Sequence, residues 1–199
     1  MIPEMSTRAY RGRSPQERVA ERRERLLAAA LDLWSELGWS GVSVRGVCAR
    51  AGLTDRYFYE SFTDRDALLL AVFDRVRDEL TGGLPAAPFT GEPRAVMRTL
   101  FLALFTALAE DPRYARVAFT DPAGSPALET RRHDALLAVA DAVAAGVSSV
   151  APGDFRGPAL FCVGGVGGLI SAWLAGRYPA APEELADRCT ELCARVFGV

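Results

Sequence analysis

The sequence predicts an all-α protein of about nine helices, and three observations support this prediction. Apolar residues recur at intervals of three and four through most of the chain, the spacing that gives a helix one buried face. The alternation of apolar and polar residues that marks a half-buried strand is nearly missing. Hydroxyl-bearing or acidic residues precede several of the apolar runs, and glycines follow some of them, as helix caps do.

The first part of the chain contains four expected helices. Each begins near a residue whose side-chain oxygen can accept a hydrogen bond from the first helical turn. In chain order these residues are Ser14, which opens the capping box Ser14-Pro15-Gln16-Glu17, then Ser43, Thr54 and Thr63 with Asp66. Gly38 ends the first helix and Gly52 ends the second, while the third runs through Phe62.

A domain boundary is expected at residues 82–91, GGLPAAPFTG, because this glycine- and proline-rich segment cannot continue a helix. We divide the chain into a flexible basic arm (1–15), a first domain (16–81) and a second domain (92–199). The arm carries Arg8, Arg11 and Arg13, and it is interpreted either as a segment that enters a DNA minor groove or as a solvated tail. Five more helices are expected in the second domain: the apolar run Val96–Leu108, one from Pro112, one from Ser125 to about Val150, and those at about 156–176 and 182–198.

Charge is distributed unevenly along the chain. The 199 residues are 50% hydrophobic and 24% charged, with a net charge of −2, which is typical of a soluble globular protein. Residues 1–50 contain nine arginines and six acidic residues, whereas residues 78–199 contain ten arginines and fourteen acidic residues. All 23 basic residues are arginine, so every cation in the chain can bind a phosphate or a base edge with two donors.

Several classes of site receive no support. The four cysteines form no CxxC pair and no dense framework, and the start of the chain has no apolar signal region, so a cytoplasmic location is expected. The single histidine, His133, cannot complete a catalytic triad or a metal site. Cys189 and Cys193 have a spacing that could bind a metal, but they are interpreted as buried thiols. We therefore expect no enzyme, no cofactor and no metal.

The segment of residues 157–176 is free of charge over twenty residues and includes the GxxxG pair Gly164 and Gly168. Its length meets the criterion for a membrane span. The other interpretation, which we adopt, is a helix packed between helices or across a dimer interface, because its glycines and alanines make it only moderately hydrophobic. No membrane association is therefore expected.

Residues 43–62, SVRGVCARAGLTDRYFYESF, predict a helix-turn-helix. Two short helices meet at a turn centred on Gly52, as in units whose second helix enters the major groove of DNA. Most positions of the second helix are polar or aromatic, which suits a groove better than a core. Because three consecutive aromatic residues cannot share one helix face, Phe58 is assigned to the core and Tyr57 and Tyr59 are assigned outward.

From about Arg18 to Val76 the chain resembles the DNA-binding region of the TetR/AcrR family of bacterial transcription regulators. The resemblance rests on the segment with the sequence VSVRGVCARAGLTDRYFYESFTDRDALL. This segment has a serine-capped first helix, an Ala-Gly turn and the pair Phe58-Tyr59. Where the family has Phe-x-x-Lys-x-x-Leu, this chain has Phe62-Thr63-Asp64-Arg65 followed by Leu68. Asp55 and Glu60 depart from the commonest pattern. The second domain resembles the family only in architecture.

The resemblance implies phosphate contacts for four residues. Ser43 and Thr54 correspond to caps at helix starts, where free backbone N–H groups favour an anion. Tyr59 corresponds to the tyrosine that donates its hydroxyl group to a phosphate. Arg65 stands where the family usually has lysine and is expected to clamp a phosphate in the same way.

Base recognition is expected from other positions of the same unit. Arg45, Arg56 and Tyr57 are the candidates for base edges, and arginine with guanine is the pairing that we expect. Asp55 either accepts a hydrogen bond from a cytosine amino group or caps the helix beside Thr54. Ser61 adds a further exposed polar group to the expected DNA-binding surface.

For the second domain, a cluster of aromatic and polar residues is compatible with a mainly apolar ligand pocket, although each aromatic residue is also compatible with simple core packing. The candidate ligand-binding residues are Met97, Phe101, Phe105, Tyr114, Phe119, His133, Phe161 and Trp173.

The resemblance implies a homodimeric repressor that pairs through helices at about 156–176 and 182–198. Two second helices would enter successive major grooves of a palindromic double-stranded DNA operator, about 34–36 Å apart. A small, mainly apolar effector would release the repressor. The alternatives are a helical enzyme and a membrane-tethered regulator that uses residues 157–176.

Overall fold

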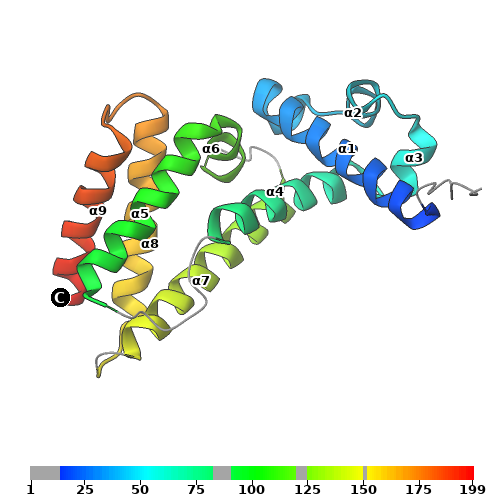
Figure 1. Ribbon diagram of the computed structural model, residues 1–199. Coiled ribbons are helices and arrows are strands. Elements are labelled where there is room, and N and C mark those ends of the chain that lie inside the picture. The colour runs from blue at the N-terminus through cyan, green and yellow to red at the C-terminus, as the bar shows by residue number, and fades with distance from the viewer. Residues whose placement is uncertain (1–13, 83–90, 120–124, 150–151) are drawn as a thin grey trace, which may run out of the picture.

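The computed structural model describes residues 14–82, 91–119, 125–149 and 152–199, and within these ranges the chain forms nine α-helices, one 3-10 helix and no strand (Figure 1). The prediction of an all-α fold is confirmed. In chain order the helices are α1 (Pro15–Leu37), η1 (Trp39–Gly41), α2 (Val44–Ala51), α3 (Asp55–Tyr59), α4 (Arg65–Thr81), α5 (Pro93–Glu110), α6 (Pro112–Phe119), α7 (Pro126–Ser148), α8 (Arg156–Leu174) and α9 (Pro182–Phe197). The three arginines of the expected basic arm and most of the 82–91 break lie outside the described residues.

Helix caps explain where the N-terminal helices begin. Ser14 and Glu17 form the expected capping box at α1, and the Ser43 hydroxyl oxygen accepts a hydrogen bond from the backbone N–H of Gly46 at α2. Two cap expectations need correction. The side chain that caps α4 is that of Asp64, not of Thr63, and Thr54 precedes α3 without a side-chain hydrogen bond to it. With five residues, α3 is also shorter than expected.

The first core lies among α1, α2, α3 and α4. Its fully buried side chains come from all four helices and include Leu26, Val47, Phe58, Leu68 and Leu69. Val19 and Leu37, near the two ends of α1, are apolar but exposed. Trp39 in η1 joins this core and packs edge-to-face on Trp34, with ring centroids 5.0 Å apart. The core therefore fixes the short helices α2 and α3 against two long ones.

The second core lies between α5, α8 and α9, at the opposite end of the molecule from α3 (Figure 1). Helix α5 packs closely along α9, and α7 packs on α8. Phe105, Ile170 and Leu185 are fully buried there. Val117 of α6 and Leu128 of α7 belong instead to the first core, so α6 and α7 attach the second half of the chain to the first.

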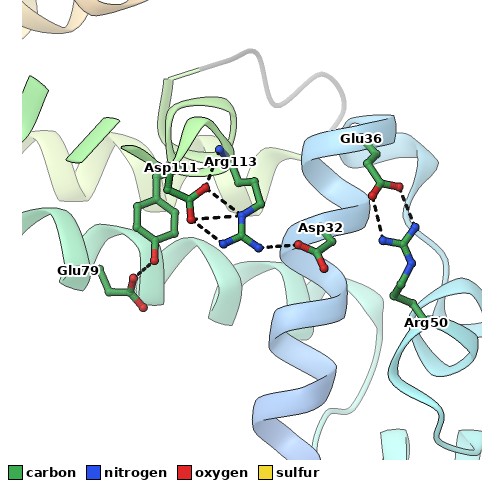
Figure 2. A network of polar contacts seen from close by, with 7 residues as sticks. Asp32, Glu36, Arg50, Glu79, Asp111 and Arg113 are labelled. Atoms are coloured by element: carbon green, nitrogen blue, oxygen red, sulfur yellow. Dashed lines mark hydrogen bonds and ion pairs between the residues drawn. The ribbon is translucent and has the colours of Figure 1, made fainter. Parts of the chain in front are cut away.

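Helix α6 is joined to α1 by a group of polar contacts (Figure 2). The Arg113 guanidinium donates through Nη1 to Asp32 of α1 at 2.6 Å, and through Nη2 and Nε to Asp111 at 2.6 and 2.9 Å. One turn later, Arg116 donates to the backbone oxygen of Ser35 at 2.7 Å. The hydrogen bonds from Arg113 hold the pKa of the Asp111 carboxyl below its ordinary value, and the two carboxylates raise the pKa of Arg113.

A further polar contact joins α6 to α4. The Tyr114 hydroxyl donates a short hydrogen bond to Glu79, and Arg75 donates to the same carboxylate at 2.9 Å. The hydrogen bond to Glu79 raises the pKa of Tyr114 to about 12. Burial opposes ionisation of Glu79, but the two hydrogen bonds outweigh it and lower the pKa of that carboxyl. Both halves of the chain are thus linked by charged hydrogen bonds as well as by apolar packing.

Candidate nucleic-acid interface

The turn between α2 and α3 is fixed by one glycine and one arginine. Gly52 has φ +63° and ψ +39°, the left-handed conformation that ends α2. The backbone N–H of Leu53 then donates to the oxygen of Cys48 at 2.9 Å. From α1, the Arg25 guanidinium donates to the backbone oxygen of Ala51 and lies 3.4 Å from that of Gly52, so it binds carbonyl groups at the C-terminal end of α2.

Helix α3 follows the sequence prediction for Phe58 and Tyr59, but Tyr57, which was also assigned outward, is partly covered. Phe58 is 0% exposed and packs on Phe62, with ring centroids 5.8 Å apart. Tyr59 is 61% exposed and the Arg56 side chain is 84% exposed. Tyr57 is half-buried. The short helix is therefore held from one side and presents two hydrogen-bonding side chains to solvent on the other.

The remaining candidates for DNA contacts fall into two groups. Ser43, Arg45 and Thr54 are exposed, and Ser61 is half-buried in the turn after α3. Arg65 is already engaged: it donates to Asp66 at 3.0 Å and its guanidinium lies 5.5 Å from the centre of the Trp39 ring. A phosphate at Arg65 would therefore compete with Asp66.

Asp55 contacts the preceding helix. Burial, followed by a hydrogen bond to the Asp55 carboxylate, raises the pKa of the Cys48 thiol. Cys48 lies inside the first core, so this contact ties the start of α3 to α2. This contact is neither the cap nor the cytosine contact expected of Asp55, so both of those roles stay predictions.

Sequence reasoning missed the contacts of two arginines that shape this surface. Arg25 was not assigned to the turn, and Arg22 was not assigned to α3. Arg22 pairs with Glu60 at 3.3 Å and lies over the ring of Tyr57 at 4.5 Å. Glu60 also lies 3.4 Å from Arg56. The spacing of Arg22 and Arg25 on one helix hinted at a shared face, but nothing in the sequence identified their partners.

Five of the eight candidate ligand-binding residues converge. Phe105 lies inside the second core, and Phe101, Tyr114, Phe119 and Trp173 pack against that core. Phe105 and Trp173 meet edge-to-face at 5.8 Å, and the indole N–H of Trp173 donates to the backbone oxygen of Ala180. The other three do not join them: Met97 is half-buried on α5, whereas His133 and Phe161 are exposed.

A groove lies elsewhere, between α1 and α4. Six of its eight lining residues are charged; the lining consists of Arg23, Glu24, Leu27, Ala71, Asp74, Arg75, Asp78 and Glu79. None of the candidate ligand-binding side chains lines it. Its carboxylates are largely matched by arginines, as in the pair of Arg75 with Glu24 at 2.8 Å.

The cysteines of α8 and α9 are packing residues. Cys162, Cys189 and Cys193 are free and buried. Burial raises the pKa of all three thiols, that of Cys189 to about 11, so they remain protonated at neutral pH. Over the ranges that the structure describes, no three histidine, cysteine or acidic side chains are arranged to hold a metal ion.

One helix in the described part of the chain, α8, is long and apolar enough to cross a membrane. Most of it is not buried within the protomer, and Phe161 on it is 71% exposed. Leu192 and Val196 of α9 are exposed as well. The protomer thus has uncovered apolar side chains on its two last helices.

Comparisons with known proteins agree with this architecture. Residues 26–72, which span the second half of α1, all of α2 and α3 and the first half of α4, match the family model described as bacterial regulatory proteins, tetR family. None of the curated proteins compared with the chain matches it.

Solved structures match over most of the chain. A transcriptional regulator from Rhodococcus sp. Rha1 is similar at a TM-score of 0.72 and 23% identity, with 87% of this chain and 96% of that one covered. A tetR-family transcriptional regulator from Streptomyces coelicolor is similar at a TM-score of 0.73 and 20% identity, and the match covers 89% of this chain and 80% of that one. The regulator FadR from Bacillus subtilis, solved in complex with stearoyl-CoA, is similar at a TM-score of 0.66 and 17% identity, and the match covers 85% of this chain and 96% of that one. Residues 26–72 therefore match the TetR family of bacterial regulatory proteins, and the chain shares the fold of solved TetR-family regulators over most of its length.

Proposed function

We propose that the protein is a transcriptional repressor that binds a palindromic DNA operator as a homodimer and is released by a small, mainly apolar effector. In this proposal residues 16–81 bind DNA and residues 92–199 hold the effector and dimerise. The regulator acts in the cytoplasm. The observation that carries the proposal is helix α3, which buries Phe58 and exposes Arg56 and Tyr59.

The chemistry of α3 suits a major groove. An arginine side chain offers two parallel donors to the O6 and N7 atoms of guanine, and Arg56 is free enough of the protein surface to do so. Tyr59 offers a hydroxyl donor to a phosphate. Ser43 and the free N–H groups at the start of α2 supply a second phosphate contact. Together these groups orient α3 and read bases.

The exposed side of α8 and α9 supports dimerisation through these helices. A Cβ atom added at Gly164, Gly165 or Gly168 would meet no atom of the protomer within 4 Å. Glycines interrupt good helix formers at a cost, so an uncovered run of them suggests that a second backbone approaches closely. Phe161 and Leu192 would then lie in the interface, and the unpaired apolar surface of the protomer would be covered.

The effector is proposed to enter the domain of α5 to α9. Support comes from the convergence of Phe101, Phe119 and Trp173 on one core. The FadR structure with stearoyl-CoA shares the fold, which makes a long acyl chain a suitable first probe. An effector shifts the protein away from DNA only by the difference between its affinities for the two states.

The first experiment tests DNA binding. The wild-type protein is used to select duplexes from a random 30-base-pair library, and its affinity for the winning sequence is measured over a salt series. A palindromic winner is expected, bound with an affinity that falls steeply with salt because each phosphate contact releases counterions. Arg56→Ala is expected to relax the base preference at one position in each half-site. Selection of no sequence would refute the proposal.

The second experiment tests the dimer. Phe161→Asp changes an exposed side chain, so the protomer should fold, whereas the dimer should dissociate in sedimentation equilibrium. Leu37→Asp is the control, because Leu37 is also an exposed apolar residue but lies on α1, outside the proposed dimer helices. A wild-type protein that stays monomeric at high concentration would contradict both the dimer and the two-site operator.

The third experiment tests the effector. Titration of stearoyl-CoA into the complex of protein and selected duplex is expected to release the DNA, and Phe119→Ala is expected to weaken that release without changing affinity for DNA alone.

A membrane-tethered regulator is the second candidate, favoured by the length and composition of α8. Full recovery of the protein from cells in the detergent-free soluble fraction would exclude it.

A further inference from the structure

Glu60 lies on the face of α3 that carries Arg56 and Tyr59, where an acidic residue is unexpected in a protein that binds a polyanion. Its carboxylate is placed between two guanidinium groups: Oε2 is 3.3 Å from Nη2 of Arg22, and Oε1 is 3.4 Å from Nε of Arg56. The first arginine comes from α1 and the second from the preceding turn of α3. A single carboxylate thus links α1 to Arg56, the arginine of α3.

Arg22 contacts α3 in a second way. Its guanidinium carbon lies 4.5 Å from the centre of the Tyr57 ring, within the range of a cation–π contact. The Arg22 side chain is only 21% exposed, so it is held in place rather than free in solvent. Arg22 therefore touches both Tyr57, within the five-residue helix α3, and Glu60, the residue directly after its C-terminal end.

This arrangement matters because α3 is too short to orient itself. One buried side chain, Phe58, anchors it to the core, and an isolated helix of this length has almost no intrinsic stability. The directions of Arg56 and Tyr57 then also depend on contacts made by their own side chains. Glu60 contacts Arg56, and Arg22 contacts Tyr57.

We propose that Arg22 and Glu60 are positioning residues for DNA recognition: Arg22 holds Tyr57 and Glu60, and Glu60 in turn orients Arg56 toward a base edge. The inference rests on the proposed function, because it assigns the geometry of the same DNA-binding surface. It has an unusual consequence. Removal of the negative charge at position 60 should improve binding to arbitrary DNA and yet impair recognition of the operator.

The test uses the pair of variants Arg22→Gln and Glu60→Gln and their combination. Loss of both side chains removes one positive and one negative charge, so the double variant has the net charge of the wild-type protein and serves as its own electrostatic control. Two probes are used: the duplex selected by the wild-type protein, and a scrambled duplex of the same length and composition. Circular dichroism verifies that each variant is folded.

The double variant is expected to bind the scrambled duplex as the wild-type protein does, and the selected duplex about 10-fold more weakly, the effect of one misaligned base contact. Glu60→Gln alone is expected to bind the scrambled duplex more tightly. The slope of log affinity against log salt should be unchanged in the double variant, because no phosphate contact is lost. Arg22→Lys, which keeps the charge beside Glu60, should recover part of the specificity.

Three results would overturn the inference. The double variant could bind the selected duplex as tightly as the wild-type protein, which would remove any positioning role. It could lose affinity equally on both duplexes, or its salt slope could fall by about one, which would make Arg22 a direct phosphate contact. Failure of the wild-type protein to select any duplex is a separate outcome, because it refutes the proposed function itself.

Discussion

The contact between α6 and α1 gives the sharpest prediction about stability. Arg113→Met removes a guanidinium that reaches Asp32 at 2.6 Å and Asp111 at 2.6 Å, while the methionine preserves much of the aliphatic stem. All three side chains are partly exposed, so each ion pair is taken at the upper part of the ~0.2–1 kcal/mol that exposed pairs contribute. The free energy of unfolding should therefore fall by about 1–2 kcal/mol. In a protein of this size, each kcal/mol lowers the thermal midpoint by about 2–4 °C.

The assay is thermal and urea unfolding followed by circular dichroism, at low salt and at 1 M NaCl. Arg77→Met is the matched control, because Arg77 also pairs with two carboxylates, Asp74 and Asp78, but both lie on its own helix. The free energy of unfolding of this control variant should fall by less, about 0.5 kcal/mol. The difference between the two variants should shrink at 1 M NaCl, where charges are screened within about 3 Å. Equal midpoints for Arg113→Met and wild type would refute the claim that this arginine holds α6 on α1.

Three further predictions concern the first core, the turn and the dependence on pH. Gly52→Ala is expected to destabilise the protein by about 1–2 kcal/mol, because φ is +63° there and a Cβ atom would lie 3.1 Å from Nη2 of Arg25; an unchanged urea midpoint would contradict this. Phe58→Ala should cost about 3–5 kcal/mol in urea unfolding, because the side chain is 0% exposed, and a loss below 1 kcal/mol would mean that α3 is not anchored there. Stability should fall as the pH drops below about 4, because Arg113 lowers the pKa of Asp111: this contribution is complete above the pKa of the unfolded carboxyl and is lost as the pH falls through the folded value. Asp111→Asn should show a smaller acid loss in the same urea series, and parallel curves for variant and wild type would refute the assignment.

The local signals in the sequence predicted local structure well. Ser14 and Ser43 cap their helices as expected, and Gly52 ends α2 in the conformation that its lack of a side chain permits. The error at Thr63 has a simple cause. Thr63 and Asp64 are adjacent residues of capping type, and the choice between them depends on which one the backbone leaves in position to accept from the first turn of α4.

The spacing of residue types in the sequence did not predict contacts between residues that are far apart in the chain. Arg22 and Glu60 are 38 residues apart, and Asp32 and Arg113 are 81 apart. An arginine on a helix surface looks the same in a sequence whether it meets water or a carboxylate, because its partner depends on how the helices cross. The aromatic residues of the second domain show the same limit, since spacing places Phe105 and Phe161 on helices but does not tell which one the neighbouring helices cover.

The sequence by itself determined the helices, the caps at Ser14 and Ser43 and the burial of Phe58 in α3, because these depend on hydrogen bonds and periodicity within a few residues. Only the tertiary structure decided which charged side chains meet. The attachment of α6 to α1 through Arg113, and the placement of Glu60 between Arg22 and Arg56, require the packing of apolar faces to bring separate helices within hydrogen-bonding distance.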